Sequence, residues 1–298
     1  MDLSPEARRF MDAPEHYFDA GTTRIAYKKF GQGPPLVMLH GWPLSGVSFS
    51  KLVRQMEDRF TCYVPDLPGC GKTEWSEQTD FSIPGRARTL SAFLRGVDLE
   101  NYFLLAHDTG ATIARMMALI EGNHIRKFAL LNTEIPFHRP PWVPLYRQLL
   151  ALPGSTVVFR TFLRSRKFLH SPMGFAGCFY AQSLLDGDFH ELAIRPLIDS
   201  PRLLRGQALA LRGIDWSVVD GMAENHKKIS MPVLLVWGED DPFFPIARAR
   251  EMATQFPHCE GVRAVPGTRL VLHEEKPFEV GKILTEFFLK RGPAGERN

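Results

Sequence analysis

One aspartate stands at the junction between an expected strand and an expected helix. Asp108 follows the apolar run at 102–106, and the helical pattern after it begins with the small residues Gly110 and Ala111. A carboxylate is ionised at pH 7, so it can displace a leaving group from an sp³ carbon without a base and form an ester. An Asp-Thr-Gly sequence also suits a carboxylate that only caps the helix. Asp108 is therefore a candidate nucleophile with a structural alternative.

The segment NYFLLAHDTGATIARMMAL resembles the nucleophile elbow of the α/β-hydrolase superfamily, in the branch with an Asp nucleophile. In that elbow a strained turn joins strand to helix, and the residues two positions to either side must be small. Ala106 and Gly110 meet this requirement, although the family usually has Gly at the first position. The resemblance favours the nucleophile over the cap for Asp108.

The loop His40-Gly41-Trp42-Pro43 resembles the HG-x-P loop of the same superfamily. The resemblance implies an oxyanion hole made by the backbone N–H groups of Trp42 and Thr109. It also places His40 and His107 beside the substrate pocket, where such residues usually hold the loops around the nucleophile.

Two acidic residues are candidates for the acid that orients a catalytic base. The run PVLLVWGEDDPFFP resembles the family's strand and turn that deliver this acid, which is the fourth residue counted from Gly238. That residue is Asp241, and its neighbour Asp240 is interpreted as a turn residue. Glu134 is the alternative acid, because some dehalogenases of this fold place the acid just after the sixth strand.

The histidine that the family uses as its base is missing from its usual position. Counting back from Pro277 in PGTRLVLHEEKP, the expected Gly-His pair falls on Arg269 and Leu270. Leu270 cannot transfer a proton, and hydrolysis of an aspartyl ester needs a base that activates water. The nearest imidazole is His273. Either the loop shifts so that His273 serves as the catalytic base, or His273 is a surface or capping residue.

The elements around these residues alternate between short aliphatic runs and helical stretches, which predicts an α/β fold. Strands are expected at about 16–18, 24–30, 35–39, 61–64, 102–106, 127–131, 233–237 and 261–265. The resemblance implies a mostly parallel, eight-stranded sheet with helices on both faces. The alternation stops between 136 and 229. We therefore expect a core formed by residues 1–135 and 230–298, with residues 136–229 as a helical cap.

Composition narrows the classes of partner. The 298 residues carry 36 Lys and Arg against 33 Asp and Glu, so no charge excess points to nucleic acid. The basic cluster of Arg160, Arg164, Arg166 and Lys167 is interpreted as a solvated helix face. No apolar run reaches the length of a membrane span, and four scattered cysteines predict no metal site and no disulfide. We expect a cytoplasmic protein that needs no cofactor or metal and has no membrane or nucleic-acid partner.

An Asp nucleophile points to epoxide hydrolases and to haloalkane or haloacid dehalogenases. Epoxide hydrolases of this fold protonate the epoxide oxygen with cap tyrosines, and the cap contains Tyr146 and Tyr180. We expect both, with Trp142, to line an apolar pocket for a small organic substrate. The residues that dehalogenases usually carry after the nucleophile are absent, since Thr109 and Ala111 stand there. An epoxide hydrolase is therefore the first hypothesis, a dehalogenase the second, and a binding or sensor protein that has lost turnover the third.

Overall fold

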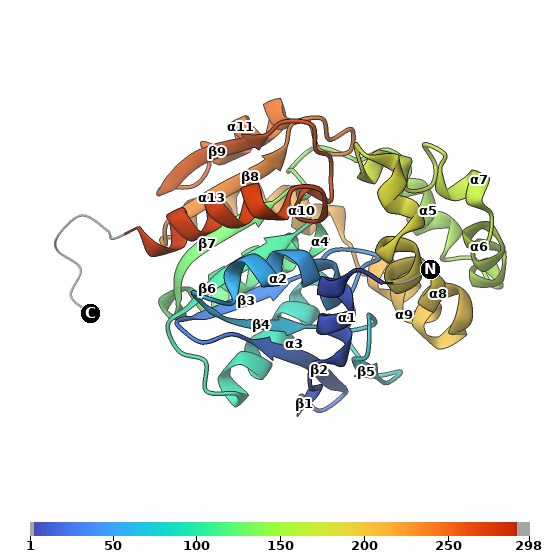
Figure 1. The fold of residues 1–298 in the computed structure, drawn as a ribbon, viewed down its shortest axis with the longest axis horizontal. Coiled ribbons are helices and arrows are strands. Elements are labelled where there is room, and N and C mark those ends of the chain that lie inside the picture. Colours follow the sequence, from blue (N-terminus) through green and yellow to red (C-terminus); the bar gives the residue numbers. More distant parts are fainter. Residues whose placement is uncertain (1–2, 291–298) are drawn as a thin grey trace.

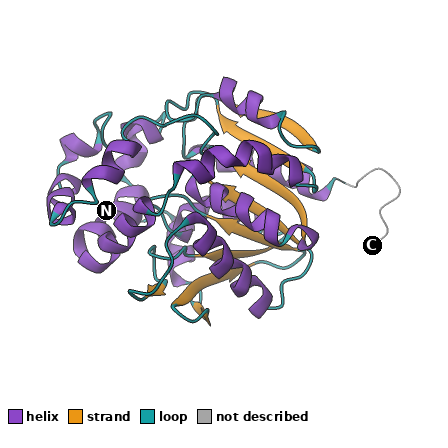
Figure 2. Cartoon of the chain, turned by 180° about the vertical axis from the view of Figure 1, so that it is seen from behind, coloured by secondary structure: helices purple, strands orange, loops and turns teal. Residues whose placement is uncertain are grey.

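The computed structural model describes residues 3–290, which form a twisted sheet between two layers of helices and a separate group of helices at one end (Figures 1 and 2). The strands are β1 (His16–Asp19), β2 (Thr23–Phe30), β3 (Pro35–Leu39), β4 (Thr61–Pro65), β5 (Glu74–Trp75), β6 (Tyr102–His107), β7 (Ile125–Leu131), β8 (Val233–Gly238) and β9 (Cys259–Val265). The eight expected strands are all present.

The strand order is β1-β2-β4-β3-β6-β7-β8-β9, with β2 antiparallel to both β1 and β4 and all later pairs parallel. The short strand β5, which the sequence pattern did not predict, adds to β2 as a ninth strand. Because β3, β6, β7 and β8 are parallel neighbours, the loops at their carboxyl ends meet along one edge of the sheet. Loops at that edge are where open parallel sheets bind ligands.

The helices of the layered part are α1 (Pro5–Asp12), α2 (Ser50–Met56), α3 (Ile83–Gly96), α4 (Thr109–Ile120), α11 (Ile246–Ala253), α12 (Leu272–Glu275) and α13 (Pro277–Leu289). Residues alternate between two apolar cores along each central strand. In β6, Leu104 and Ala106 pack with α3 and α4, whereas Phe103 and Leu105 pack with α2 and α13. A parallel strand with both faces buried reads as a continuous apolar run, which explains why these strands were predictable.

The segment between β7 and β8 is helical and contains no strand. Its helices are α5 (Val143–Leu149), α6 (Ser155–Leu163), α7 (Arg166–Leu169), α8 (Arg195–Asp199), α9 (Pro201–Arg212) and α10 (Trp216–Asn225). The segment also contains one π-helical turn at His190–Ile194 and 3₁₀ turns at Ala176–Cys178, Gln182–Asp186 and His226–Lys228. Outside this segment, 3₁₀ turns cover Gly46–Phe49 and Gly122–His124. Helices α5 to α9 form the group at the end of the molecule away from β9 (Figure 1). Within residues 3–290, no helix is both long and apolar enough to cross a membrane.

Candidate active site

Asp108 occupies the turn between β6 and α4. Its backbone has φ of +48° and ψ of −132°, a conformation that is strained for any residue with a side chain. Glycines on both sides allow the close approach that this turn needs. A Cβ on Gly110 would lie 2.2 Å from the carbonyl oxygen of His40, and a Cβ on Gly41 would lie 2.4 Å from Cβ of Asp108. The loop after β3 therefore packs directly against the turn.

Backbone N–H groups from two loops hold the Asp108 carboxylate. The N–H of Trp42 donates to Oδ2 at 2.8 Å, and the N–H of Thr109 also donates to the carboxylate. The Thr109 hydroxyl lies 3.3 Å from Oδ2. Burial raises the pKa of Asp108 well above its ordinary value, the charge of Glu134 raises it further, and the N–H donors lower it in part. The predicted oxyanion donors thus already contact a carboxylate oxygen.

Glu134 lies beside Asp108 and is held by three threonine hydroxyls. Thr109 donates to Oε1 at 2.9 Å, and Thr112 and Thr133 donate to Oε2 at 2.7 and 3.0 Å. The Thr109 hydroxyl thus lies between the two buried carboxylates. Charge-assisted bonds of this kind fix the orientation of the Glu134 side chain.

A buried arginine, Arg115, is hydrogen-bonded to the groups around Glu134. The guanidinium of Arg115 donates to the hydroxyls of Thr112 and Thr133 and to the backbone carbonyl of Glu134, at 2.6, 3.2 and 2.9 Å. Arg115 is fully buried, so its positive charge acts on the carboxylates through a medium that screens weakly. Arg115 and Thr112 were not among the residues predicted from the sequence. The signal was Arg115 itself, the only charged residue of α4, the helix directly after the candidate nucleophile.

A cavity of about 720 Å³, counted with its opening to solvent, lies over Asp108. Its polar lining includes Asp108, Thr109 and Glu134, and the rest is mainly aromatic and aliphatic. Of the predicted pocket residues, Trp142 and Tyr146 line it, as does Trp42, which was predicted as an oxyanion donor. His40, His107 and Tyr180 are not among the lining residues.

The three side chains outside the cavity have other contacts. His40 is bonded to the carbonyl of Gly41 and the N–H of Leu67, and Nε2 of His107 lies 2.9 Å from the carbonyl oxygen of Leu270. Both imidazoles hold loops beneath Asp108, and burial lowers the pKa of each to about 4. Tyr180 is 55% exposed.

Asp241 is buried at the end of β8 and accepts several hydrogen bonds. The N–H groups of Phe243 and Phe244 donate to Oδ1, and the amide of Asn132 donates to Oδ2. Burial raises the pKa of Asp241 to about 7, and these donors oppose the rise. In the described residues, no imidazole is bonded to this carboxylate. The side-chain partner of Asp241 is instead Asn132, which was not predicted from the sequence.

His273 lies in α12 and does not line the cavity. Its ring centre is 4.9 Å from that of Phe49 and 4.6 Å from that of His107, and neither ring nitrogen has a hydrogen-bond partner among residues 3–290. Burial lowers the pKa of His273 well below its ordinary value, which keeps the ring neutral. Leu270 lines the cavity instead. The structure thus brings together Asp108, Trp42, Thr109 and Glu134, but does not bring His273 to them.

Comparisons with known proteins agree with this architecture. A family model described as alpha/beta hydrolase fold matches residues 34–276. Haloalkane dehalogenase 2 of Mycobacterium bovis is 23% identical over 97% of this chain and 99% of its own length. The structure of the epoxide hydrolase CorEH has a TM-score of 0.76 at 20% identity, covering 92% of this chain and 98% of that one. A loop variant of the haloalkane dehalogenase DbeA from Bradyrhizobium elkanii has a TM-score of 0.72 at 20% identity, covering 93% and 96%.

Proposed function

The chain belongs to the alpha/beta hydrolase fold family, and we propose that it is a hydrolase that forms an alkyl ester on Asp108. The observation that carries this proposal is the Asp108 carboxylate, held by Trp42 at the floor of a largely apolar cavity. Oδ1 is the nucleophile, since Oδ2 is held by Trp42. Oδ1 bonds to the substrate carbon as the bond from that carbon to its leaving group breaks. The N–H of Trp42 then stabilises Oδ2 as the ester carbonyl.

The cavity supports a small apolar electrophile as the substrate, and an epoxide is the first candidate. Tyr146 lines the cavity as a phenol that could supply a proton to the opening epoxide oxygen. Its hydroxyl donates to the carbonyl of Met173, so this role requires the phenol to turn toward the substrate. Residues 136–229 would act as the cap that covers the substrate.

A haloalkane is the second candidate, supported by the relative named haloalkane dehalogenase 2. Halide departure needs no proton, only N–H groups or other positive edges around the leaving atom. The products separate the two candidates, because an epoxide yields a diol, whereas a haloalkane yields an alcohol and a halide ion.

Hydrolysis of the ester is assigned to Glu134, in place of the histidine that the sequence led us to seek. Glu134 lines the same cavity as Asp108, whereas His273 is packed on His107. In this step a water molecule gives a proton to Glu134, and its oxygen attacks Cγ of Asp108. The bond from Cγ to the alkyl oxygen then breaks, and the leaving alkoxide takes the proton back from Glu134 and departs as the alcohol. The water oxygen stays on the regenerated Asp108 carboxyl group, which releases its remaining proton to solvent. Asp241 would orient the loop after β8 through Phe243 and Phe244.

Intact-protein mass spectrometry with styrene oxide and 1-bromobutane tests the proposal. Wild type should form product, and Asp108→Ala should form neither product nor adduct. Glu134→Gln should accumulate the Asp108 ester, and His273→Ala should behave like wild type. An ester that accumulates in His273→Ala instead would reinstate His273 as the base.

A third possible outcome of this experiment is an ester on Asp108 that wild type does not hydrolyse. Leu270 lines the cavity where a base is expected, so wild type could retain one alkyl group on Asp108 without releasing it. That result would make the chain a covalent binding or sensor protein and would remove Glu134 from the mechanism. Adduct formation in Asp108→Ala would overturn the nucleophile itself.

A further inference from the structure

One stretch of the chain has a charge balance unlike the rest. Residues 136–185 contain six Arg and Lys residues and no Asp or Glu, although the whole chain has 36 basic and 33 acidic residues. This stretch covers α5, α6 and α7, of which α6 and α7 lie at the outer end of the helical group (Figure 1). Arg139 and Arg166 are paired with Asp220 and Asp186, which lie outside this stretch, so four of the six cations have no ion pair within residues 3–290. The remaining positive charge favours negatively charged partners over a second copy of the same surface.

The same region exposes several large apolar side chains on α5, α6 and the loop between them, and these residues are here called the α5–α6 face. It consists of Leu145 and Leu149 on α5, Leu152 in the connecting loop, and Val157, Val158 and Phe162 on α6. Val157 is 69% exposed and Phe162 is 50% exposed. Single exposed apolar residues are ordinary, but six on two successive helices and the loop that joins them mark a surface that contacts something other than water.

Helix α6 packs against the rest of the protein on the side opposite the α5–α6 face. Its exposed apolar residues therefore belong to a helix that also has a buried side. Phe159 and Leu163 are buried, and Phe159 lines the cavity over Asp108. An amphipathic helix normally presents polar residues to solvent. In α6 both sides are apolar, which is typical of a helix with a second apolar environment.

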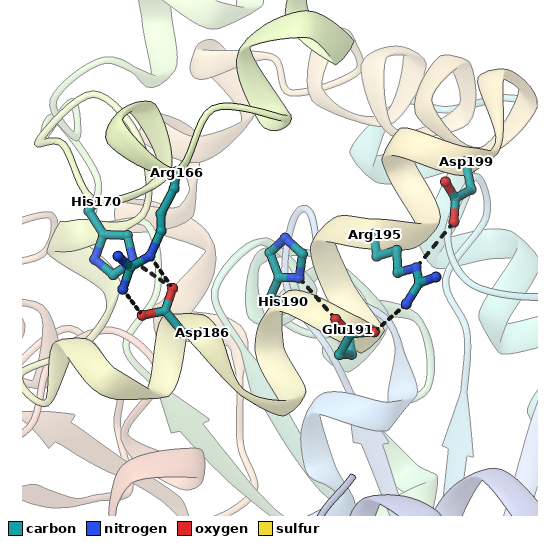
Figure 3. A network of polar contacts seen from close by, with 7 residues as sticks. All are labelled: Arg166, His170, Asp186, His190, Glu191, Arg195 and Asp199. Atoms are coloured by element: carbon teal, nitrogen blue, oxygen red, sulfur yellow. Dashed lines mark hydrogen bonds and ion pairs between the residues drawn. The ribbon is translucent and has the colours of Figure 1, made fainter. Parts of the chain in front are cut away.

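Two cations, one directly after α6 and one in α7, are available to an external partner. Arg164 and Lys167 are exposed and have no ion pair among the described residues. Arg166 differs because it is bonded to Asp186, which also holds His170, as Figure 3 shows. The sequence analysis interpreted this basic cluster as solvated. The structure adds an apolar surface directly beside it.

We propose that the α5–α6 face binds the surface of a membrane that contains anionic lipids. The apolar side chains would enter the boundary between headgroups and acyl chains, while Arg164 and Lys167 contact the phosphates. A second copy of the chain is disfavoured as the occupant, because a symmetric dimer through this face would bring two cationic surfaces together. The proposal goes beyond the hydrolytic function and differs from the expectation that the protein has no membrane partner.

The cavity over Asp108 is lined in part by the helices that carry the α5–α6 face. Trp142, Tyr146 and Phe159 line the cavity and belong to the same two helices or to the residue preceding them. Trp142 is also exposed, and tryptophan is favoured at membrane interfaces. An apolar substrate dissolved in the bilayer would therefore meet the entrance to the site without crossing water.

Co-flotation of the full chain with vesicles tests the proposal. One set of vesicles contains phosphatidylcholine alone, and the other also contains phosphatidylserine. We expect binding to the second set, and we expect added salt to weaken it. Arg164→Gln and Lys167→Gln should each lower the partition coefficient of the protein onto the anionic vesicles by about fivefold. Lys282→Gln, on the exposed side of α13, is the matched control and should have no effect of this size.

The double variant Val157→Ser, Phe162→Ser tests the apolar contribution and should abolish detectable flotation. Phe278→Ser, at an exposed phenylalanine on α13, is its control and should float like wild type. No flotation of wild type, or equal flotation of the α6 variant, would overturn the proposal. So would a wild-type dimer in sedimentation velocity that the α6 variant dissociates, since the face would then cover a second copy.

Discussion

Asp108 and Glu134 are two buried carboxylates on either side of one hydroxyl. Oγ1 of Thr109 lies 3.3 Å from Oδ2 of Asp108 and 2.9 Å from Oε1 of Glu134. Burial raises the pKa of Asp108 well above its ordinary value, and the nearby charge of Glu134 raises it further. The pair therefore couples the nucleophile to the group that we assign to the hydrolytic step.

Replacing Glu134 should change the pH at which Asp108 becomes nucleophilic. The pKa of Asp108 is raised by burial and then by the charge of Glu134, so the rate of ester formation should rise with pH above the ordinary aspartate range. Glu134→Gln removes the second cause and should move this profile to lower pH. Glu121→Gln, at a buried glutamate paired with Arg95, is the control. The profile is measured by quenched single-turnover mass spectrometry, and an unchanged profile in Glu134→Gln would contradict the coupling.

Asp241 should make wild type less stable as the pH rises. Its pKa is about 7 in the folded protein against 3.8 for the free group, so the folded state binds the extra proton between those values. The stability that this proton contributes is present below pH 4 and is lost as the pH rises to 7, by up to roughly 4 kcal/mol. Urea unfolding at several pH values should show this slope in wild type and in Asp240→Asn, but a flatter one in Asp241→Asn. Equal slopes in all three proteins would contradict the assignment of this pH dependence to Asp241.

Leu270→His should supply the base that the family normally has. Leu270 lines the cavity, so an imidazole there would face the ester of Asp108. General-base assistance is worth about 10²–10⁴-fold, so in the Glu134→Gln background, which lacks the assigned base, ester hydrolysis should accelerate within that range. Arg269→Gly is added to ease the turn. Leu270→Gln in the same background, polar but not basic, should leave the rate of ester hydrolysis near that of Glu134→Gln alone. Equal acceleration by Gln would show that polarity, not proton transfer, is responsible.

Gly110→Ala should destabilise the protein because its Cβ would lie 2.2 Å from a backbone oxygen of His40. Backbone cannot yield as a flexible side chain can, so a loss of roughly 1–3 kcal/mol is expected. Gly221→Ala in α10 is the matched control. Nothing lies within 4 Å of its Cβ, and a gain of up to about 1 kcal/mol is expected. The midpoint of urea unfolding measures both, and similar values would contradict the close packing of the elbow.

Local pattern was enough to predict the strands and the elbow. Buried parallel strands need continuous apolar runs, and a strained turn between strand and helix needs small neighbours, so both requirements are written in adjacent residues. Ala106, Asp108 and Gly110 could therefore be identified together. The position of the helical segment between β7 and β8 followed from the interruption of the same alternation.

Only the tertiary structure decided which side chains meet Asp108. Thr109 and Glu134 are 25 positions apart, and their contact depends on the pairing of β6 with β7. His273 is three residues from Leu270, yet α12 turns its ring onto Phe49 while Leu270 lines the cavity. The direction of a side chain in a loop or a short helix depends on what packs against it, and that information is spread over the whole chain. For this reason the sequence determined the strands and the turn that carries Asp108, and the fold decided which side chains surround it.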